Sequence, residues 1–145
     1  MIKFFEGKYA FLSNFYESPF EYEGVVYPTN EHFFQAMKTL DLEERKKIAA
    51  AKTPGKAKRL GRKVSLRPDW EEVKVGVMSL GLSLKFAIPE LREALLATGD
   101  AELEEGNTWH DNIWGVCCCN ECRCKGKNLL GNLLMTRRAI IRGEL

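Results

Sequence analysis

Strand-like sequence is confined largely to the first 28 residues of this 145-residue chain. The aromatic-rich run from Phe20 to Tyr27 has Glu23-Gly24 near its middle and is closed by Pro28. Apolar residues on both sides of such a turn predict a short β-hairpin. From Thr29 onwards, the start and stop signals are those of helices. The sequence therefore predicts a single α+β domain over residues 1–145, mainly helical, with a small amino-terminal β-sheet.

Capping and proline signals divide the rest of the chain into short helices. Thr29 is a predicted N-cap, Asp41 and Glu44 have the spacing of a capping box, and Thr53-Pro54 opens another helix. The first expected helix begins at residue 29. The others cover residues 42–51, 54–60, a segment after residue 68, 90–96 and 129–142. Residues 98–105 are expected to form a loop, and residues 112–116 a short strand.

Helical spacing also predicts which side chains are buried. In the first helix, Phe33, Met37 and Leu40 lie on an apolar stripe, separate from the polar stripe Glu31, Gln35 and Lys38. In the helix after residue 68, the predicted buried face is the following set: Val73, Val77, Leu80 and Leu84.

Composition removes several classes of protein. The apolar fraction of 45% and charged fraction of 29% are those of an ordinary globular chain, not of a disordered or fibrous one. Lys and Arg total 22 against 20 for Asp and Glu, so the net charge of +2 does not favour a nucleic-acid or membrane partner. Because no apolar run approaches the roughly 20 residues of a membrane span and no signal peptide is evident, we expect a cytoplasmic protein.

All five cysteines lie in one short segment, as Cys117, Cys118, Cys119, Cys122 and Cys124. Their number is odd and their spacing too short to join distant parts of a fold, so a secreted disulfide framework is not expected. Cys119 and Cys122 form one C-x-x-C pair, whereas structural zinc normally requires two well-separated pairs. With only His32 and His110 in the chain, a histidine-rich site is excluded as well. We therefore expect free thiols and no metal, and a metal ion bound by this loop is the alternative interpretation.

A basic run lies between residues 56 and 67 without an intervening acid: Lys56, Lys58, Arg59, Arg62, Lys63 and Arg67. Guanidinium groups match phosphate oxygens in a bidentate manner, so the run suits a phosphate-bearing ligand. A solvated helix face is the alternative interpretation.

A second unusual segment runs from Trp109 to Gly115, where two tryptophans flank Asp111. Aromatic faces and a glycine that lets a ligand approach the backbone would suit a flat heterocycle. The alternative is that Trp109 and Trp114 are core aromatics and that Asp111 is a turn residue.

Several short motifs, taken in order, resemble one known family over nearly the whole chain. They are Leu12-Ser13-Asn14-Phe15-Tyr16, the run from Tyr27 to Lys38, Leu60-Gly61-Arg62, Arg67-Pro68-Asp69-Trp70, Val77-Met78, Leu84-Lys85-Phe86, Asp111-Asn112-Ile113-Trp114-Gly115, Gly126-Lys127-Asn128-Leu129-Leu130-Gly131 and Leu134-Met135. The ordered set resembles the NADAR family of YbiA-like N-glycosidases. Many relatives have a glycine-rich segment where this chain has its cysteines, so the resemblance says least about that loop.

The resemblance implies a mainly helical α+β enzyme that hydrolyses the bond between a nitrogenous base and ribose. The implied substrates are phosphorylated ribosylamino-pyrimidines of the early riboflavin pathway or, as the alternative, ADP-ribose attached to guanine. No cofactor is implied, the partner is a small phosphorylated N-riboside or ADP-ribosylated guanine, and the oligomeric state is not predicted. The alternative from another class is a non-catalytic nucleotide or nucleic-acid binding module.

By this resemblance, Glu31, Lys85 and Asp111 are the expected catalytic residues. The expected substrate-binding residues are Asn14, Gln35, Lys38, Arg59, Arg62, Trp70, Trp114, Gly115 and Asn128. Either a carboxylate activates water against an oxocarbenium-like ribose, or a neutral Lys85 attacks the anomeric carbon and forms a Schiff base. We favour the lysine route, in which Trp70 and Trp114 stack on the base.

Overall fold

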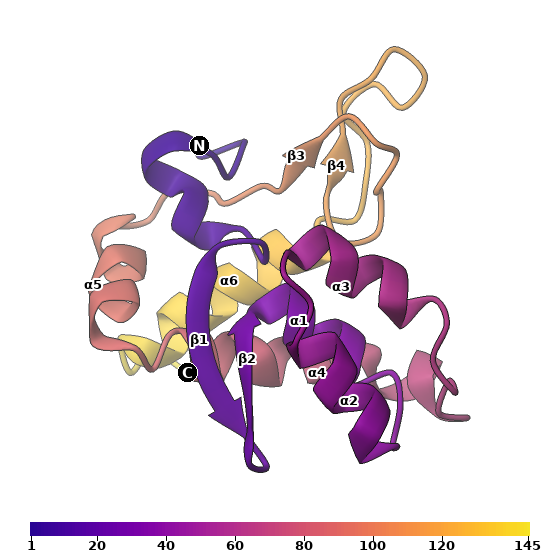
Figure 1. Cartoon of the computed structure of the whole chain (residues 1–145). Coiled ribbons are helices and arrows are strands. Elements are labelled where there is room, and N and C mark those ends of the chain that lie inside the picture. The colour runs from indigo at the N-terminus through magenta and orange to yellow at the C-terminus, as the bar shows by residue number, and fades with distance from the viewer. The chain divides into compact units, whose positions relative to one another are not determined.

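The computed structural model describes all residues from Met1 to Leu145 and confirms a mainly helical α+β fold (Figure 1). The chain forms two compact units. The central unit is Asn14–Lys85, and the terminal unit combines Met1–Ser13 with Phe86–Leu145. Each unit is described by itself below.

The predicted hairpin is confirmed in the central unit. Strand β1 (Glu17–Tyr22) pairs antiparallel with β2 (Val25–Thr29). At the turn, Glu23 and Gly24 both have positive φ, 49° and 81°, as a type I′ hairpin requires. Strand β2 continues through Pro28 to Thr29 rather than ending at the proline, which a two-stranded sheet tolerates because both strands are edges.

Helix α1 (Asn30–Ala36) lies at the centre of this unit and contacts β2, α2, α3 and α4. All of its residues are buried, and the Thr29 side chain caps it by accepting a hydrogen bond from the His32 N–H. Helices α2 (Leu42–Ala49) and α3 (Pro54–Gly61) begin at the predicted caps, Asp41 and Thr53. Because α1 ends at Ala36, the predicted apolar stripe fails at Leu40, which is 64% exposed.

Helix α4 (Trp70–Lys85) begins where expected, but its predicted buried face is wrong. The buried residues are Trp70, Met78, Gly81, Leu82 and Lys85. Leu80 is 37% exposed, and Val73, Val77 and Leu84 are only partly buried. The physical reason is a close approach to α1: a Cβ at Gly81 would collide with the Asn30 side chain. The smallest residue, not the aliphatic stripe, therefore faces α1.

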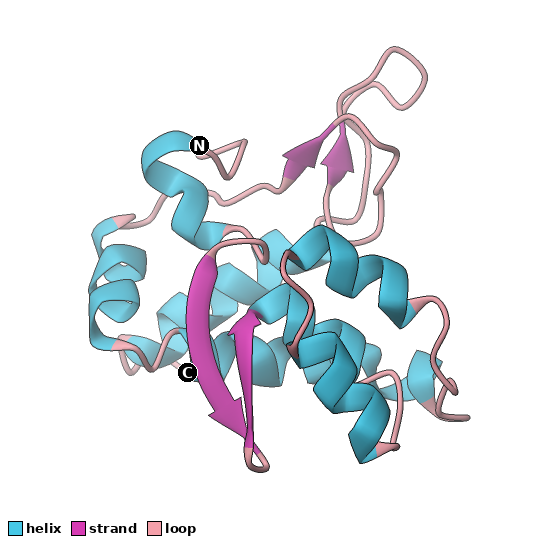
Figure 2. Ribbon diagram, viewed as in Figure 1, coloured by secondary structure: helices cyan, strands magenta, loops and turns pink.

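The terminal unit contains η1 (Gly7–Leu12), α5 (Pro89–Ala97), β3 (Gly106–Asn107), β4 (Val116–Cys117) and α6 (Leu129–Ile141). Helices α5 and α6 match the predicted ranges closely and contact each other. The predicted strand at residues 112–116 is wrong, because residues 113–115 form bends and β4 starts only at Val116. Apart from β3 and β4, residues 106–128 are drawn as loop in Figure 2. None of the helices has the length and apolarity to span a membrane.

Candidate active site

Glu31 and Gln35, the two residues of the polar stripe that lie in α1, are buried although their side chains are polar. Glu31 is 7% exposed and Gln35 is 4% exposed. The Glu31 backbone N–H donates to the Asn14 carbonyl at 3.0 Å, and Gln35 Nε2 donates to Glu31 Oε1 at 3.0 Å. One helix turn thus places an amide donor beside the carboxylate. The structure brings Asn14, Glu31 and Gln35 together, as a shared site requires.

Basic groups from α3 reach the other end of this stripe. Burial lowers the pKa of Lys38, while the nearby Glu31 carboxylate opposes that shift and Arg62 adds to it. The close approach of α3 depends on Gly61, since a Cβ there would collide with the Gln35 amide. Gln35 Oε1 is buried at this point without a hydrogen-bond partner. It is an acceptor that a ligand's N–H or O–H could satisfy.

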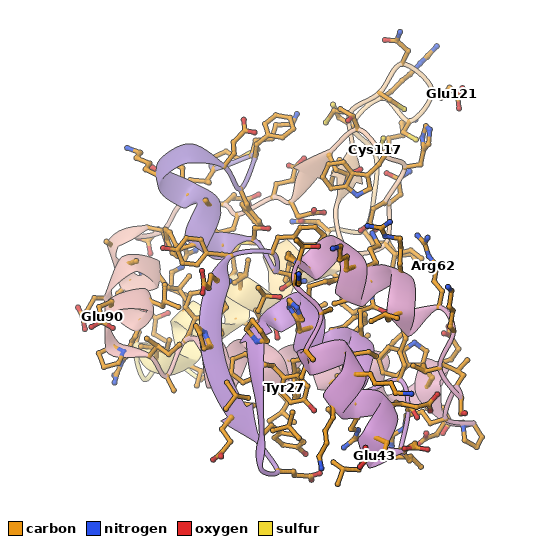
Figure 3. The ribbon with its side chains drawn as sticks, viewed as in Figure 1. Tyr27, Glu43, Arg62, Glu90, Cys117 and Glu121 are labelled. Atoms are coloured by element: carbon orange, nitrogen blue, oxygen red, sulfur yellow. The ribbon has the colours of Figure 1, made fainter.

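Two arginines of the basic run differ in their surroundings. Arg62 follows Gly61 and influences Lys38, whereas Arg59 lines an open hollow of about 270 Å³ together with Ala51, Lys56 and Leu60. Both guanidinium groups belong to exposed residues, and Figure 3 labels Arg62, the residue that follows the end of α3. Both side chains are therefore accessible to a phosphate. The charge of Arg62 also acts on Lys38, which belongs to the same polar stripe as Glu31.

Lys85, the last residue of α4, is fully buried, with 0% of its surface exposed. Desolvation disfavours an ammonium, and burial accordingly lowers the pKa of Lys85 from 10.5 to about 7. Its Nζ lies 5.9 Å from the centroid of the Tyr16 ring. At neutral pH a large fraction of this side chain is a neutral amine, which can act as a nucleophile.

The same face of α4 is linked to Asn14. Met78 lies two helix turns before Lys85, and its sulfur is 3.5 Å from the side-chain amides of both Asn14 and Asn30. The two asparagines also contact each other through a 2.9 Å hydrogen bond. Asn14 therefore connects α1, beside Glu31, with the buried face of the helix that ends at Lys85.

Trp70 lies in the core rather than at an open surface. It is 6% exposed, and its ring packs against Phe34 with centroids 5.0 Å apart. Tyr16, which is 40% exposed, and Phe15, which is 48% exposed, are more accessible aromatics. Sequence reasoning assigned neither of them to the site, although both directly follow Asn14 in the quoted motif. Tyr16 is the aromatic that lies beside Lys85.

In the terminal unit, Asp111 organises a turn. Its Oδ1 accepts from the backbone N–H groups of Ile113 and Trp114, at 3.2 and 3.0 Å. Asn107 holds the same residue through its side chain, which bonds both the N–H and the carbonyl of Asp111. This is the side-chain-to-backbone pattern of an Asx turn. Trp114 is half-buried at the end of the turn, while Trp109 is 60% exposed.

Gly115 and Asn128 also have structural partners. A Cβ at Gly115 would collide with Glu105, so protein atoms fill the space in which a ligand was expected to approach. Asn128 Oδ1 accepts from the Glu105 N–H at 3.0 Å, and its Nδ2 donates to the Leu103 carbonyl at 2.9 Å. Asn128 therefore joins the start of α6 to residues 103–105, and Gly115 packs against Glu105.

The expected site residues thus divide between the units. The central unit contains Asn14, Glu31, Gln35, Lys38, Arg59, Arg62, Trp70 and Lys85, and the terminal unit contains Asp111, Trp114, Gly115 and Asn128. The central group supplies a buried carboxylate, a buried amine and exposed cationic side chains. The terminal group lies around one turn that hydrogen bonds hold in place.

Comparison with known proteins agrees with this chemistry. The model of the NADAR domain family matches residues 3–142. N-glycosidase YbiA of Escherichia coli is 44% identical over 133 residues, which cover 90% of this chain and 80% of the relative. An N-glycosidase of Nostoc punctiforme is 37% identical over 143 residues, covering 94% of this chain and 88% of the relative.

A riboflavin biosynthesis protein of Vibrio vulnificus is 35% identical over 133 residues, which are 90% of this chain but 35% of the relative. The NMR structure of E. coli YbiA superposes with a TM-score of 0.80 at 39% identity, covering 99% of this chain and 88% of that one. The chain therefore belongs to the NADAR family, as one of its N-glycosidases, hydrolases that act on N-glycosyl bonds.

Proposed function

We propose that the protein hydrolyses the base–ribose bond of a phosphorylated ribosylamino-pyrimidine. The observation that carries the proposal is Lys85, an amine buried at the end of α4 with its pKa lowered to about 7. A buried lysine costs folding free energy, so its presence favours a chemical role. A relative named as a riboflavin biosynthesis protein supports a substrate from that pathway, and the resemblance to the NADAR family implies the ribosylamino-pyrimidine phosphates.

The bond between base and ribose breaks after its nitrogen gains a proton. The electron pair of the C1′–N bond then leaves with the base, and the neutral Nζ of Lys85 bonds to C1′. The proton that Nζ then loses passes to the ring oxygen O4′ as the C1′–O4′ bond breaks, which gives an open-chain iminium between C1′ and Lys85. Water adds to C1′, a proton returns to Nζ as the C1′–Nζ bond breaks, and ribose phosphate leaves while the neutral amine of Lys85 is regenerated. The net reaction is hydrolysis, in which one water is consumed and the base and ribose phosphate are released.

Glu31 is the proton-transfer group in this scheme. Its carboxyl group lies beside the Gln35 amide and within the influence of Lys38. As a general acid it protonates the leaving nitrogen, and as a carboxylate it accepts the proton that Nζ or water loses. Gln35 orients the carboxyl group by donating to Oε1.

The phosphate of the substrate is assigned to Arg62 and Arg59. Arg62 lies beside Lys38, and Arg59 lines the hollow on α3. If they bind phosphate, Arg62→Gln and Arg59→Gln should weaken binding of the phosphorylated substrate by about tenfold or more and leave binding of the dephosphorylated nucleoside nearly unchanged. The exposed Lys63→Gln, in the same run but outside the assigned pair, is the matched control. Equal losses for both ligands would make the basic run a solvated face.

A product assay tests the proposed reaction itself. The purified chain is given a ribosylamino-pyrimidine phosphate in one arm and ADP-ribosylated guanine in the other, and base and sugar release are followed by chromatography. We expect release of ribose phosphate in the first arm. Turnover confined to the second arm would replace the substrate class, and hydrolysis of neither would favour a binding module.

A further inference from the structure

One histidine and three cysteines of the terminal unit converge on a single point. His110 Nδ1 lies 3.4 Å from Cys122 Sγ, 3.5 Å from Cys119 Sγ and 3.9 Å from Cys117 Sγ. The four ligand atoms all lie within 4.8 Å of one another. A tetrahedral zinc ion with Zn–S of about 2.3 Å and Zn–N of about 2.0 Å separates nitrogen from sulfur by about 3.5 Å. The observed separations bracket that value.

The fold brings these ligands together from two stretches of chain. Strands β3 and β4 pair in parallel, so that Asn107 is opposite Cys117, and the Cys118 N–H donates to the Asn107 carbonyl at 2.7 Å. The chain then turns through His110, whose φ is 67°, and so returns the imidazole to the cysteines. Histidine tolerates this left-handed conformation better than most residues. The histidine therefore reaches the site from before β4, and the cysteines from within β4 and after it.

The C-x-x-C turn completes the arrangement. The Arg123 N–H donates to the Cys119 carbonyl at 2.9 Å, and Arg123 has a φ of 54°, which turns the chain sharply after Cys122. In Figure 3, Cys117 lies nearer the base of this loop and Glu121 near its outer tip. The spacing of the cysteines in the sequence showed one ligand pair, Cys119 and Cys122. The pairing of β3 with β4 brings His110 and Cys117 together as the second pair.

Each of the three sulfurs also accepts a hydrogen bond from nitrogen. The His110 N–H donates to Cys117 Sγ at 3.3 Å, the Cys122 N–H to Cys119 Sγ at 3.4 Å, and Asn112 Nδ2 to Cys122 Sγ at 3.2 Å. Donors directed at sulfur stabilise thiolates and fix their orientation, as the outer partners of metal ligands do. Neutral thiols require no such set of donors.

We propose that His110, Cys117, Cys119 and Cys122 bind one Zn²⁺ ion. On binding, the three thiols release their protons to solvent, and the neutral imidazole supplies Nδ1. All four positions of the tetrahedron are filled by the protein, so the ion is structural and has no open position for catalysis. This revises the expectation of free thiols. The ion would fix the loop that carries Asp111 and Trp114. The zinc site does not depend on which substrate the protein hydrolyses.

The remaining two cysteines provide matched controls. Cys118 Sγ points to the Val116 carbonyl at 3.9 Å, and Cys124 Sγ accepts from Lys3 Nζ at 3.6 Å. Neither belongs to the converging set. Cys118→Ser and Cys124→Ser change the same kind of residue in the same loop without removing a proposed ligand.

Metal content and the cobalt spectrum test the site. The untagged full chain is purified under reducing conditions, supplied with Zn²⁺, freed of excess metal and analysed by elemental mass spectrometry. We expect one zinc per chain, and replacement by Co²⁺ should give the visible bands of tetrahedral cobalt with thiolate charge transfer. Cys122→Ser and His110→Gln, at residues that are not fully buried, should each weaken zinc affinity at least about tenfold. The two control variants should retain it.

Three results would overturn the proposal. They are less than a tenth of an equivalent of zinc in the folded wild-type chain, octahedral cobalt without charge transfer, and equal losses in the Cys118→Ser control and Cys122→Ser. Circular dichroism of every variant shows that the chain is folded. If Cys122→Ser did not fold, His110→Gln would decide, because its side chain is exposed.

Discussion

The face of α1 and α4 and the loop at residues 106–128 hold polar groups by opposite means. On the helices, Glu31 and Lys85 are buried by packing, and desolvation lowers the pKa of Lys85. In the loop, the polar side chains of Asp111 and Asn128 are each satisfied by backbone partners. Burial changes the reactivity of a group, whereas hydrogen bonding to backbone fixes its position. We therefore propose that the helices supply the chemistry and that the loop positions the substrate.

Replacing Lys85 should have the largest effect on the reaction. Lys85→Met removes the nucleophile but keeps an unbranched side chain in the buried position, so we expect a loss of at least about 10³-fold in kcat with the fold intact. The control is Lys74→Met on the same helix, where the lysine pairs with the exposed Glu71. Near-normal turnover by Lys85→Met, measured by product release, would transfer the chemistry to water activation.

Glu31→Gln should have the next largest effect. The amide keeps an oxygen that can accept from Gln35 Nε2, but it cannot transfer a proton, so kcat should fall by about 10² to 10⁴-fold. Thermal unfolding should change little. The exposed Glu43→Gln on α2 is a suitable control. An unchanged rate with an unchanged melting temperature would remove Glu31 from the mechanism.

The buried amine should also appear in the pH dependence of stability. The folded pKa of Lys85, about 7, lies below its ordinary value of 10.5, so between these pH values the unfolded state carries one proton more than the folded state. The stability of the wild type relative to Lys85→Met should therefore rise with pH by up to about 1.4 kcal/mol per unit above pH 7. Below pH 7 both states are protonated, and the difference should become constant. Denaturant unfolding at pH 6, 7, 8 and 9 measures it, and a flat difference throughout would mean that Lys85 is not desolvated.

The smallest effect is expected in the loop. Asp111→Asn keeps an Oδ1 that can accept from the Ile113 and Trp114 N–H groups, so a positioning role predicts a rate within about threefold of wild type. Asp111→Ala removes the acceptor and should raise KM and lower stability. If Asp111→Asn were as inactive as Glu31→Gln, the loop would supply chemistry as well, and the contrast between the two regions would fail.

The sequence predicted most of the elements because capping is local. Thr29, Asp41 and Thr53 begin their helices as their side chains dictate, and Glu23-Gly24 forms the hairpin turn. The buried face of α4 was not predictable, because it depends on contact between Gly81 and Asn30, which are distant in sequence. The same limit hid the contact between Tyr16 and Lys85 and the core position of Trp70.

The cluster of His110 with the cysteines also depends on contacts that the sequence does not show. Its residues were visible in the sequence, but the convergence of His110 with them depends on the parallel pairing of β3 and β4, two strands of two residues each. Strands this short have no periodicity to detect. By contrast, Glu31 and Lys85 were named from the family resemblance, which requires no knowledge of contacts between distant residues.

Covalent trapping tests whether Lys85 is the nucleophile. Borohydride added during turnover reduces an iminium to a stable secondary amine, and mass spectrometry of the digested chain locates the added sugar phosphate. We predict one adduct per chain on Lys85. The adduct should be absent without substrate and absent in Lys85→Met. Steady turnover with no adduct, or an adduct on another lysine, would contradict it.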